Sequence, residues 1–132
     1  MKWLDRSLIL GPYLTLCLSQ TELDEVCCHL KMKEPLTIPQ VNACVFTIKN
    51  TKDGRSACIV CLPILLGKHL VEIMGLLVHE SMHIWQEVRR FIGEDNPSKE
   101  FEAYALQNIS QTLVEEFLSR VVCRGLVVRS LK

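Results

Sequence analysis

The stretch Leu76-Leu77-Val78-His79-Glu80-Ser81-Met82-His83-Ile84-Trp85 is apolar, and two histidines and one glutamate interrupt it in the pattern H-E-x-x-H. Residues four apart on an α-helix lie about 40° apart around the axis and one turn apart along it. His79 and His83 can therefore direct two imidazole nitrogens at one point. Zinc accepts neutral histidine nitrogens at roughly 2.0–2.1 Å, and a catalytic zinc takes three protein ligands and leaves one position for water. Glu80 follows the first histidine and is placed to take a proton from that water.

The flanking residues support a helix with one ligand-bearing face. On a helical wheel, a set of apolar residues lies on the side opposite to His79, namely Leu70, Ile73, Leu77, Ile84, Val88 and Phe91. The alternative is a chance match to the pattern in a buried helix. Burying two histidines and a glutamate without a partner would cost several kcal/mol, and a bound metal removes that cost. The helix therefore favours a metal site.

A third protein ligand has to come from outside this pattern. The longer H-E-x-x-H-x-x-G-x-x-H pattern fails because Gln86 and Arg89 stand where the glycine and the third histidine would be. In the helical segment after Pro97, Glu102 falls on the apolar stripe, within about 60° of Ala105, Leu106, Ile109, Leu113 and Phe117. Glu100 points about 160° away. A glutamate on a buried stripe needs a partner, so we expect Glu102 as the third ligand, with Glu100 as the alternative.

These residues carry a family resemblance. The H-E-x-x-H pattern followed by Glu102-Ala103 on a later helix resembles the gluzincin metallopeptidases. More closely, the region 79–117 is similar to small metallopeptidase-like proteins of tailed phages and prophages, through Gly-Glu-x-x-Pro-Ser at 93–98 and Glu-Phe-Glu-Ala-Tyr at 100–104. A fainter similarity is to metallopeptidases that cut phage-type repressors. The resemblance covers about half of the chain strongly.

The resemblance implies a hydrolase with one zinc ion per chain. Zinc on His79, His83 and Glu102 would lower the pKa of its water to around 7. Glu80 would act as general base, taking the proton as the water attacks a peptide carbonyl and passing it to the leaving amine. The substrate would be a peptide or a protein.

The chain departs from the family in its supporting residues. Many gluzincins have an aspartate four residues after the third ligand to hold a zinc histidine, and Leu106 stands there instead. A backbone carbonyl, Gln86 or Asn108 could replace that aspartate. Tyr104 is directed away from Glu102, so the open candidates for an oxyanion donor are Tyr13, His29 and His69.

These departures suggest a second hypothesis, a non-catalytic phage or prophage accessory protein. Its zinc would hold two helices together, and its surface would bind a partner. Glu80 distinguishes the two hypotheses, because a purely structural site has no use for a carboxylate beside its first ligand. Structural sites also tend to be closed by four cysteine or histidine ligands, whereas three ligands are found here.

The 132 residues predict a single α+β domain with a zincin-like fold. The H-E-x-x-H helix and the glutamate-bearing helix would pack with an N-terminal helix and a small antiparallel β-hairpin. Residues 1–18 are expected to be a packing segment with Trp3, Leu4, Leu8 and Tyr13 in the core, and 19–33 a helix that begins with the capping box Ser19 to Glu22. Residues 43–62 should form the hairpin, with a turn at Asp53-Gly54. The H-E-x-x-H helix should span 68–92, and the third-ligand helix 97–118. An exposed strand of the hairpin could bind a peptide over the metal, or the hairpin could simply cover the helix.

The composition indicates which classes of partner and which cellular compartment to expect. Lys plus Arg and Asp plus Glu number 15 each, which favours neither nucleic acid nor an anionic membrane as partner. The apolar start is interrupted at Asp5-Arg6 and Gly11-Pro12, and no cleavage site typical of a signal peptide follows. Seven cysteines without regular spacing predict reduced thiols in the cytoplasm. A second metal site from Cys27, Cys28 and His29 is the alternative use of three of these side chains.

Overall fold

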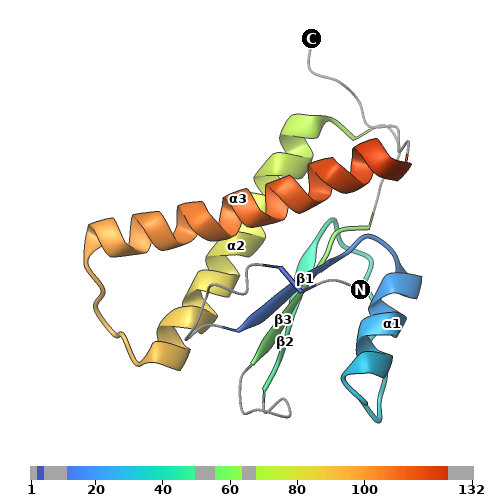
Figure 1. The fold of residues 1–132 in the computed structure, drawn as a ribbon, viewed down its shortest axis with the longest axis horizontal. Helices are drawn as coiled ribbons and strands as arrows, with labels where there is room; N and C mark the ends of the chain where they lie inside the picture. Colours follow the sequence, from blue (N-terminus) through green and yellow to red (C-terminus); the bar gives the residue numbers. More distant parts are fainter. Residues whose placement is uncertain (1–2, 5–11, 50–55, 64–67, 125–132) are drawn as a thin grey trace. The chain divides into compact units, whose positions relative to one another are not determined.

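The computed structural model describes residues 3–4, 12–49, 56–63 and 68–124. Within them it has three strands and three helices, which confirms the α+β class (Figure 1). The elements are β1 (Tyr13–Cys17), α1 (Gln20–His29), β2 (Cys44–Ile48), β3 (Ala57–Cys61), α2 (Leu70–Ile92) and α3 (Lys99–Arg124). The chain divides into two compact units, Met1–Ile64 and Leu65–Lys132. The first holds the sheet and α1, and the second holds α2 and α3.

The sheet has strand order β1-β3-β2. Strands β2 and β3 pair antiparallel, with Cys44 opposite Cys61 and Ile48 opposite Ala57, which confirms the predicted pairing within 43–62. The Asp53-Gly54 turn lies outside the described residues. All five residues of the central strand β3 are buried. A strand covered on both faces reads as a continuous apolar run rather than an alternating one, as Ala-Cys-Ile-Val-Cys does.

Strand β1 is an element that the sequence did not predict. Tyr13 to Cys17 were expected in a packing segment, and the structure pairs them in parallel with β3, Tyr13 opposite Ala57. Four of the five residues of β1 are buried, so the strand lacks the polar alternation that would have identified it. The expected core role of Leu4 is confirmed, since it is buried and its N–H donates to the Leu14 carbonyl at 2.7 Å. Leu8 lies outside the described residues.

Helix α1 begins at the predicted cap. The Ser19 hydroxyl accepts from the Glu22 N–H at 3.3 Å, and the Glu22 carboxylate accepts from the Leu18 N–H at 3.2 Å. The helix ends at His29 rather than at the predicted residue 33, because Lys31 adopts a left-handed φ of 55°. The helix packs on the sheet through a cluster of buried residues made of Cys17, Leu23, Val26, Cys27, Ile59 and Cys61.

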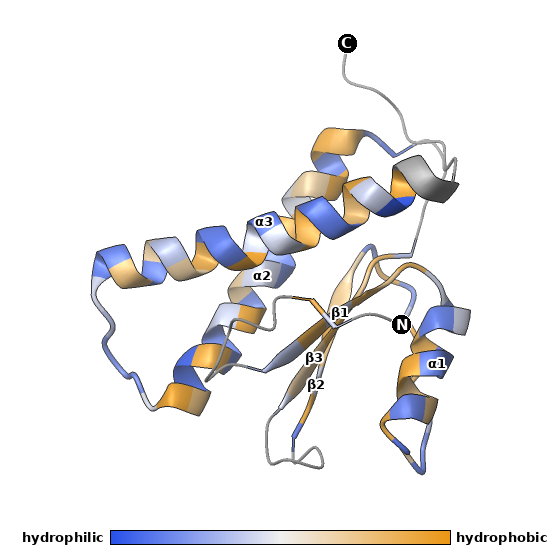
Figure 2. Ribbon diagram, in the orientation of Figure 1, coloured by the Kyte–Doolittle hydropathy of each residue, from blue (hydrophilic) through white to orange (hydrophobic). Residues whose placement is uncertain are grey.

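Helices α2 and α3 make up the second unit, and apolar and hydrophilic residues alternate along both (Figure 2). The predicted end of α2 is confirmed, since it stops at Ile92 with Gly93 as a left-handed C-cap. Helix α3 begins at Lys99 rather than at the predicted residue 97, and Ser98 caps it, since its hydroxyl accepts from the Phe101 N–H at 3.2 Å. It continues to Arg124, past the predicted end at Leu118. No helix in the described part of the chain is both long and apolar enough to cross a membrane.

Replacing Gly75, within α2, and Gly93, its C-cap, with alanine should have opposite effects on the stability of the protein. Gly93 has a φ of 73°, and an added Cβ would meet nothing within 4 Å there, so Gly93→Ala should lower the free energy of unfolding by about 1–2 kcal/mol through backbone strain alone. Gly75 lies within the helix, and an added Cβ would likewise meet nothing within 4 Å. Gly75→Ala should therefore raise the free energy of unfolding by about 0.5–1 kcal/mol. Urea denaturation of the two variants beside the wild type measures both changes. Equal effects of the same sign would show that the left-handed cap does not form.

Candidate metal centre

His79 and His83 lie one turn apart on α2. Both side chains are exposed, their ring centroids are 5.1 Å apart, and the rings are inclined at 73°. The face behind them is buried at Ile73, Leu77, Ile84 and Val88, four of the six residues predicted there. The structure thus brings two imidazoles together one turn apart, as the spacing predicts. Both lie at the surface, so the expectation that the histidines are buried is wrong, and only Glu80 of the three is buried.

Gln86 contacts the second histidine of the pair. Its Oε1 lies 3.3 Å from Nδ1 of His83, one turn further along the exposed face. An amide oxygen can only accept a hydrogen bond, so this contact favours the tautomer of His83 that carries its proton on Nδ1. The Nε2 nitrogen is then the one with a free lone pair for a metal. Gln86 is one of the residues considered for this task from the sequence.

Glu80 lies on the buried side of α2, next to the histidine face. Only 5% of it is exposed. Burial raises the pKa of its carboxyl above the ordinary value, and the positive charge that His79 and His83 can carry opposes that rise. A carboxylate with a raised pKa holds a proton more readily, which suits a group that takes a proton and later returns it.

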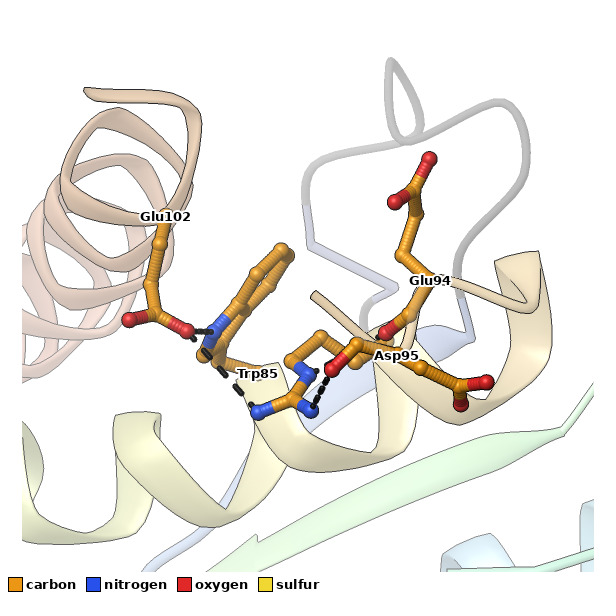
Figure 3. Close-up of polar contacts among 5 residues, drawn as sticks. Trp85, Glu94, Asp95 and Glu102 are labelled. Carbon is orange, nitrogen blue, oxygen red and sulfur yellow. Dashed lines mark hydrogen bonds and ion pairs between the residues drawn. The ribbon is translucent and has the colours of Figure 1, made fainter. Parts of the chain in front are cut away.

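Glu102 is placed away from the histidines, in the first turn of α3. Its Oε2 accepts a hydrogen bond from the indole Nε1–H of Trp85 at 2.8 Å, and Arg89 Nη1 lies 3.9 Å from the same oxygen (Figure 3). Across residues 3–4, 12–49, 56–63 and 68–124, no three His, Cys, Asp or Glu side chains are grouped so that they could hold a metal ion. Glu102 as placed therefore does not join His79 and His83, and the expected three-ligand group is not formed among the described residues.

The remaining candidates are also spread out. Glu100 is exposed in the same turn of α3, and Asn108 is exposed further along it. His69 precedes α2 as its N-cap and is ten residues before His79, which corresponds to about 15 Å along a helix axis. Tyr13 and His29 belong to the first unit, where both rings lie beside Trp3, with centroid separations of 5.5 and 6.1 Å respectively. Within the second unit, Glu100 and His69 form no metal-binding group with the histidine pair.

Trp85 and Arg89 are the residues that the sequence analysis missed. They are four apart on α2 and both contact Glu102. A signal was present, because a tryptophan on the buried side of a helix needs an acceptor for its indole N–H, and a carboxylate on the next helix can supply it.

Three cysteines form a row across the sheet, and the alternative metal site of Cys27, Cys28 and His29 is not formed among the described residues. Cys44, Cys61 and Cys17 lie opposite one another across the three strands. Hydrogen bonding to the Cys17 thiol, together with burial, raises the pKa of the Cys61 thiol far above its ordinary value, which disfavours the reactive thiolate. Six cysteines form no disulfide in the structure, namely Cys17, Cys27, Cys28, Cys44, Cys58 and Cys61.

Comparison of the chain with protein-family models, with curated proteins and with solved structures finds no match.

Proposed function

We propose that this chain is a zinc-dependent metallopeptidase of the gluzincin type, with a zincin-like fold, that hydrolyses peptide bonds. The observation that carries the proposal is the pair His79 and His83, exposed on one face of α2 with 5.1 Å between ring centroids, beside the buried carboxyl of Glu80. Two neutral nitrogens next to a general base are the donor types of a catalytic zinc site.

His79 and His83 would hold the metal, and Glu102 would be the third ligand after leaving Trp85. Zinc, when bound, supplies a Lewis acid that polarises a carbonyl and makes a water nucleophilic near neutral pH. Glu80 takes a proton from the water that attacks the carbonyl carbon. It then gives this proton to the amide nitrogen as the carbon–nitrogen bond breaks, which leaves an amine and a carboxylic acid that loses its remaining proton to solvent at neutral pH.

Glu80 is suited to both transfers by its burial. A surface glutamate near its ordinary pKa would be a weak base at neutral pH, and the loss of hydration makes Glu80 a stronger one. Its position one residue after His79 keeps its backbone fixed relative to the histidine pair by the helix itself.

The cysteines indicate the compartment in which the reaction would take place. Six cysteines that form no disulfide favour a reducing compartment, which we propose to be the cytoplasm. The H-E-x-x-H pattern implies a peptide or protein substrate, which the enzyme would encounter there.

The second candidate, a non-catalytic zinc protein whose metal joins two helices, is less well supported. Helices α2 and α3 are already linked by the Trp85–Glu102 hydrogen bond at 2.8 Å and by the contact of Arg89 with the same oxygen. A metal is therefore not needed to hold α2 and α3 together. The buried carboxyl of Glu80 would likewise have no role in such a protein.

The proposal is tested by the zinc content of the protein purified without added metal or chelator. We expect about one zinc per chain in the wild type and in Glu100→Ala, and loss of zinc in Glu102→Ala. Glu100→Ala is the matched control, because it removes an exposed carboxylate from the same turn of α3. A wild type that contains no zinc and binds none when it is added would overturn the proposal. Zinc loss in Glu100→Ala alone would move the third ligand to Glu100.

A further inference from the structure

Three cysteines of the first unit lie side by side across the sheet, one on each strand. Cys17 of β1 and Cys44 of β2 both stand opposite Cys61 of the central strand β3 (Figure 1). Side chains that stand opposite one another on neighbouring strands point to the same face of a sheet. Here α1 covers that face, because Cys17 and Cys61 belong to the buried cluster between the sheet and α1, and Cys44 packs against it. We call these three residues the thiol row.

The geometry of the thiol row suits a disulfide at Cys61. Its thiol is in hydrogen-bond contact with the thiols of both Cys17 and Cys44. Opposed residues of an antiparallel pair have Cα atoms about 4.5–5.5 Å apart, and a disulfide needs about 4.4–6.8 Å. Cys61 can therefore bond to Cys44 without movement of the backbone. Cys17 and Cys44 cannot bond to each other, because they are separated by two strand spacings, about 10 Å.

Access from solvent distinguishes the members of the thiol row. Cys17 and Cys61 are 1% and 0% exposed. Cys44 is only partly buried, and it is the first residue of β2, an outer strand of the sheet. A dissolved reagent therefore reaches Cys44 first. Cys58, also on β3, is three residues from Cys61 and points to the opposite face of the sheet, so it lies outside the row.

We propose that Cys44 and Cys61 are a reversible disulfide site that reacts with low-molecular-weight disulfides of the glutathione class. The Cys44 thiolate attacks one sulfur of the reagent, whose S–S bond breaks, and the first thiolate leaves. The Cys61 sulfur then attacks the Cys44 sulfur of the mixed disulfide and displaces the second thiolate. The two leaving thiolates take up the two protons that Cys44 and Cys61 lose. Two protein thiols are thus oxidised to a disulfide, and one reagent disulfide is reduced to two thiols.

Reaction at Cys44 also prepares Cys61 for the second step. The pKa of the Cys61 thiol is raised by the hydrogen bond with Cys17, by burial and by the charge of Cys17, and then by the charge and hydrogen bond of Cys44. A Cys44 sulfur in a mixed disulfide carries no charge and no proton, so its share of the increase is lost. Cys61 is thus the poorer nucleophile until Cys44 has reacted, which fixes the order of the two steps. The site does not depend on the proposed peptidase activity.

The proposal is tested by mapping disulfides in the full chain after incubation with oxidised glutathione. The remaining thiols are alkylated, the protein is cleaved with trypsin without reduction, and mass spectrometry identifies linked peptides. Trypsin separates Cys44, in peptide 34–49, from Cys61, in peptide 56–68. We expect these two peptides to be joined, with loss of two of the seven thiols of the chain. An excess of reduced glutathione should reopen the bond.

Two alanine variants of β3 distinguish Cys61 from the other cysteine in the same peptide. Cys61→Ala should lose the linked species, because it removes the thiol that faces Cys44. Cys58→Ala should keep it, because that thiol lies on the opposite face. The two variants are matched, since both remove a buried thiol from the same strand. If Cys61→Ala does not fold, the fragment spectrum of the linked wild-type peptides identifies which cysteine carries the bond.

Each outcome of the mapping decides the proposal. A link between peptides 34–49 and 56–68 that carries Cys61 and reopens with reduced glutathione supports it. A bond from either peptide to another one, such as 7–31 with Cys17, overturns it. Glutathione that stays on Cys44 shows that Cys61 does not displace it, and a chain that keeps all seven thiols shows that Cys44 does not react. Either result overturns the proposal.

Discussion

Replacing Glu80 with glutamine should lower the rate of peptide cleavage by about 10²–10⁴-fold while zinc stays bound. Glutamine has nearly the same shape and remains able to sit in the buried position, but its amide cannot take a proton from water. His79 and His83 are unchanged in this variant, so the metal content should match the wild type. Cleavage is measured by mass spectrometry on a mixed peptide library, and zinc by elemental analysis of the same samples.

Glu87→Gln is the control for this prediction. Glu87 lies two turns further along α2, where its carboxylate pairs with Arg90, and it takes no part in the proposed site. We expect wild-type cleavage from that variant. A Glu80→Gln protein that cleaved the library at the wild-type rate would show that Glu80 is not the general base.

Replacing Phe117 with alanine should lower the free energy of unfolding by about 3–5 kcal/mol. The Phe117 side chain is fully buried and continues the apolar stripe of α3 through Ile109 and Leu113. Removing the ring loses its burial and leaves a cavity that the surroundings fill only in part. Small domains have about 5–15 kcal/mol of stability in total, so this variant should unfold at a much lower urea concentration.

Leu118→Ala provides the comparison. Leu118 is the next residue of the same helix and is 40% exposed, so its replacement should change the free energy of unfolding by less than about 0.5 kcal/mol. Both variants keep a good helix former in place, and any difference between them reports packing rather than helix propensity. Similar losses in the two proteins would show that α3 does not pack along the stripe that contains Phe117.

The helices were the best predicted part of the fold. The end of α2 at Gly93 and the apolar side of this helix follow from a glycine after the last turn and from the 3.6-residue period. The antiparallel pairing of β2 with β3 also followed from two β-rich runs close in sequence. Strand β1 was missed because its partner β3 is forty or more residues away and because burial on both faces removes the alternating pattern.

In the candidate site, too, the features that depend on local spacing could be predicted, and the contacts between helices could not. The proximity of His79 and His83, and the position of Glu80 on the buried side, depend on spacing within one helix, and helix geometry makes that spacing readable from the residues. The partner of Glu102 depends on how two helices pack. The apolar stripe of α3 indicated that Glu102 needs a partner, but a helical wheel contains no information about the neighbouring helix. Only the packing of α3 against α2 shows that Trp85 and Arg89, rather than the histidines, hold that carboxylate.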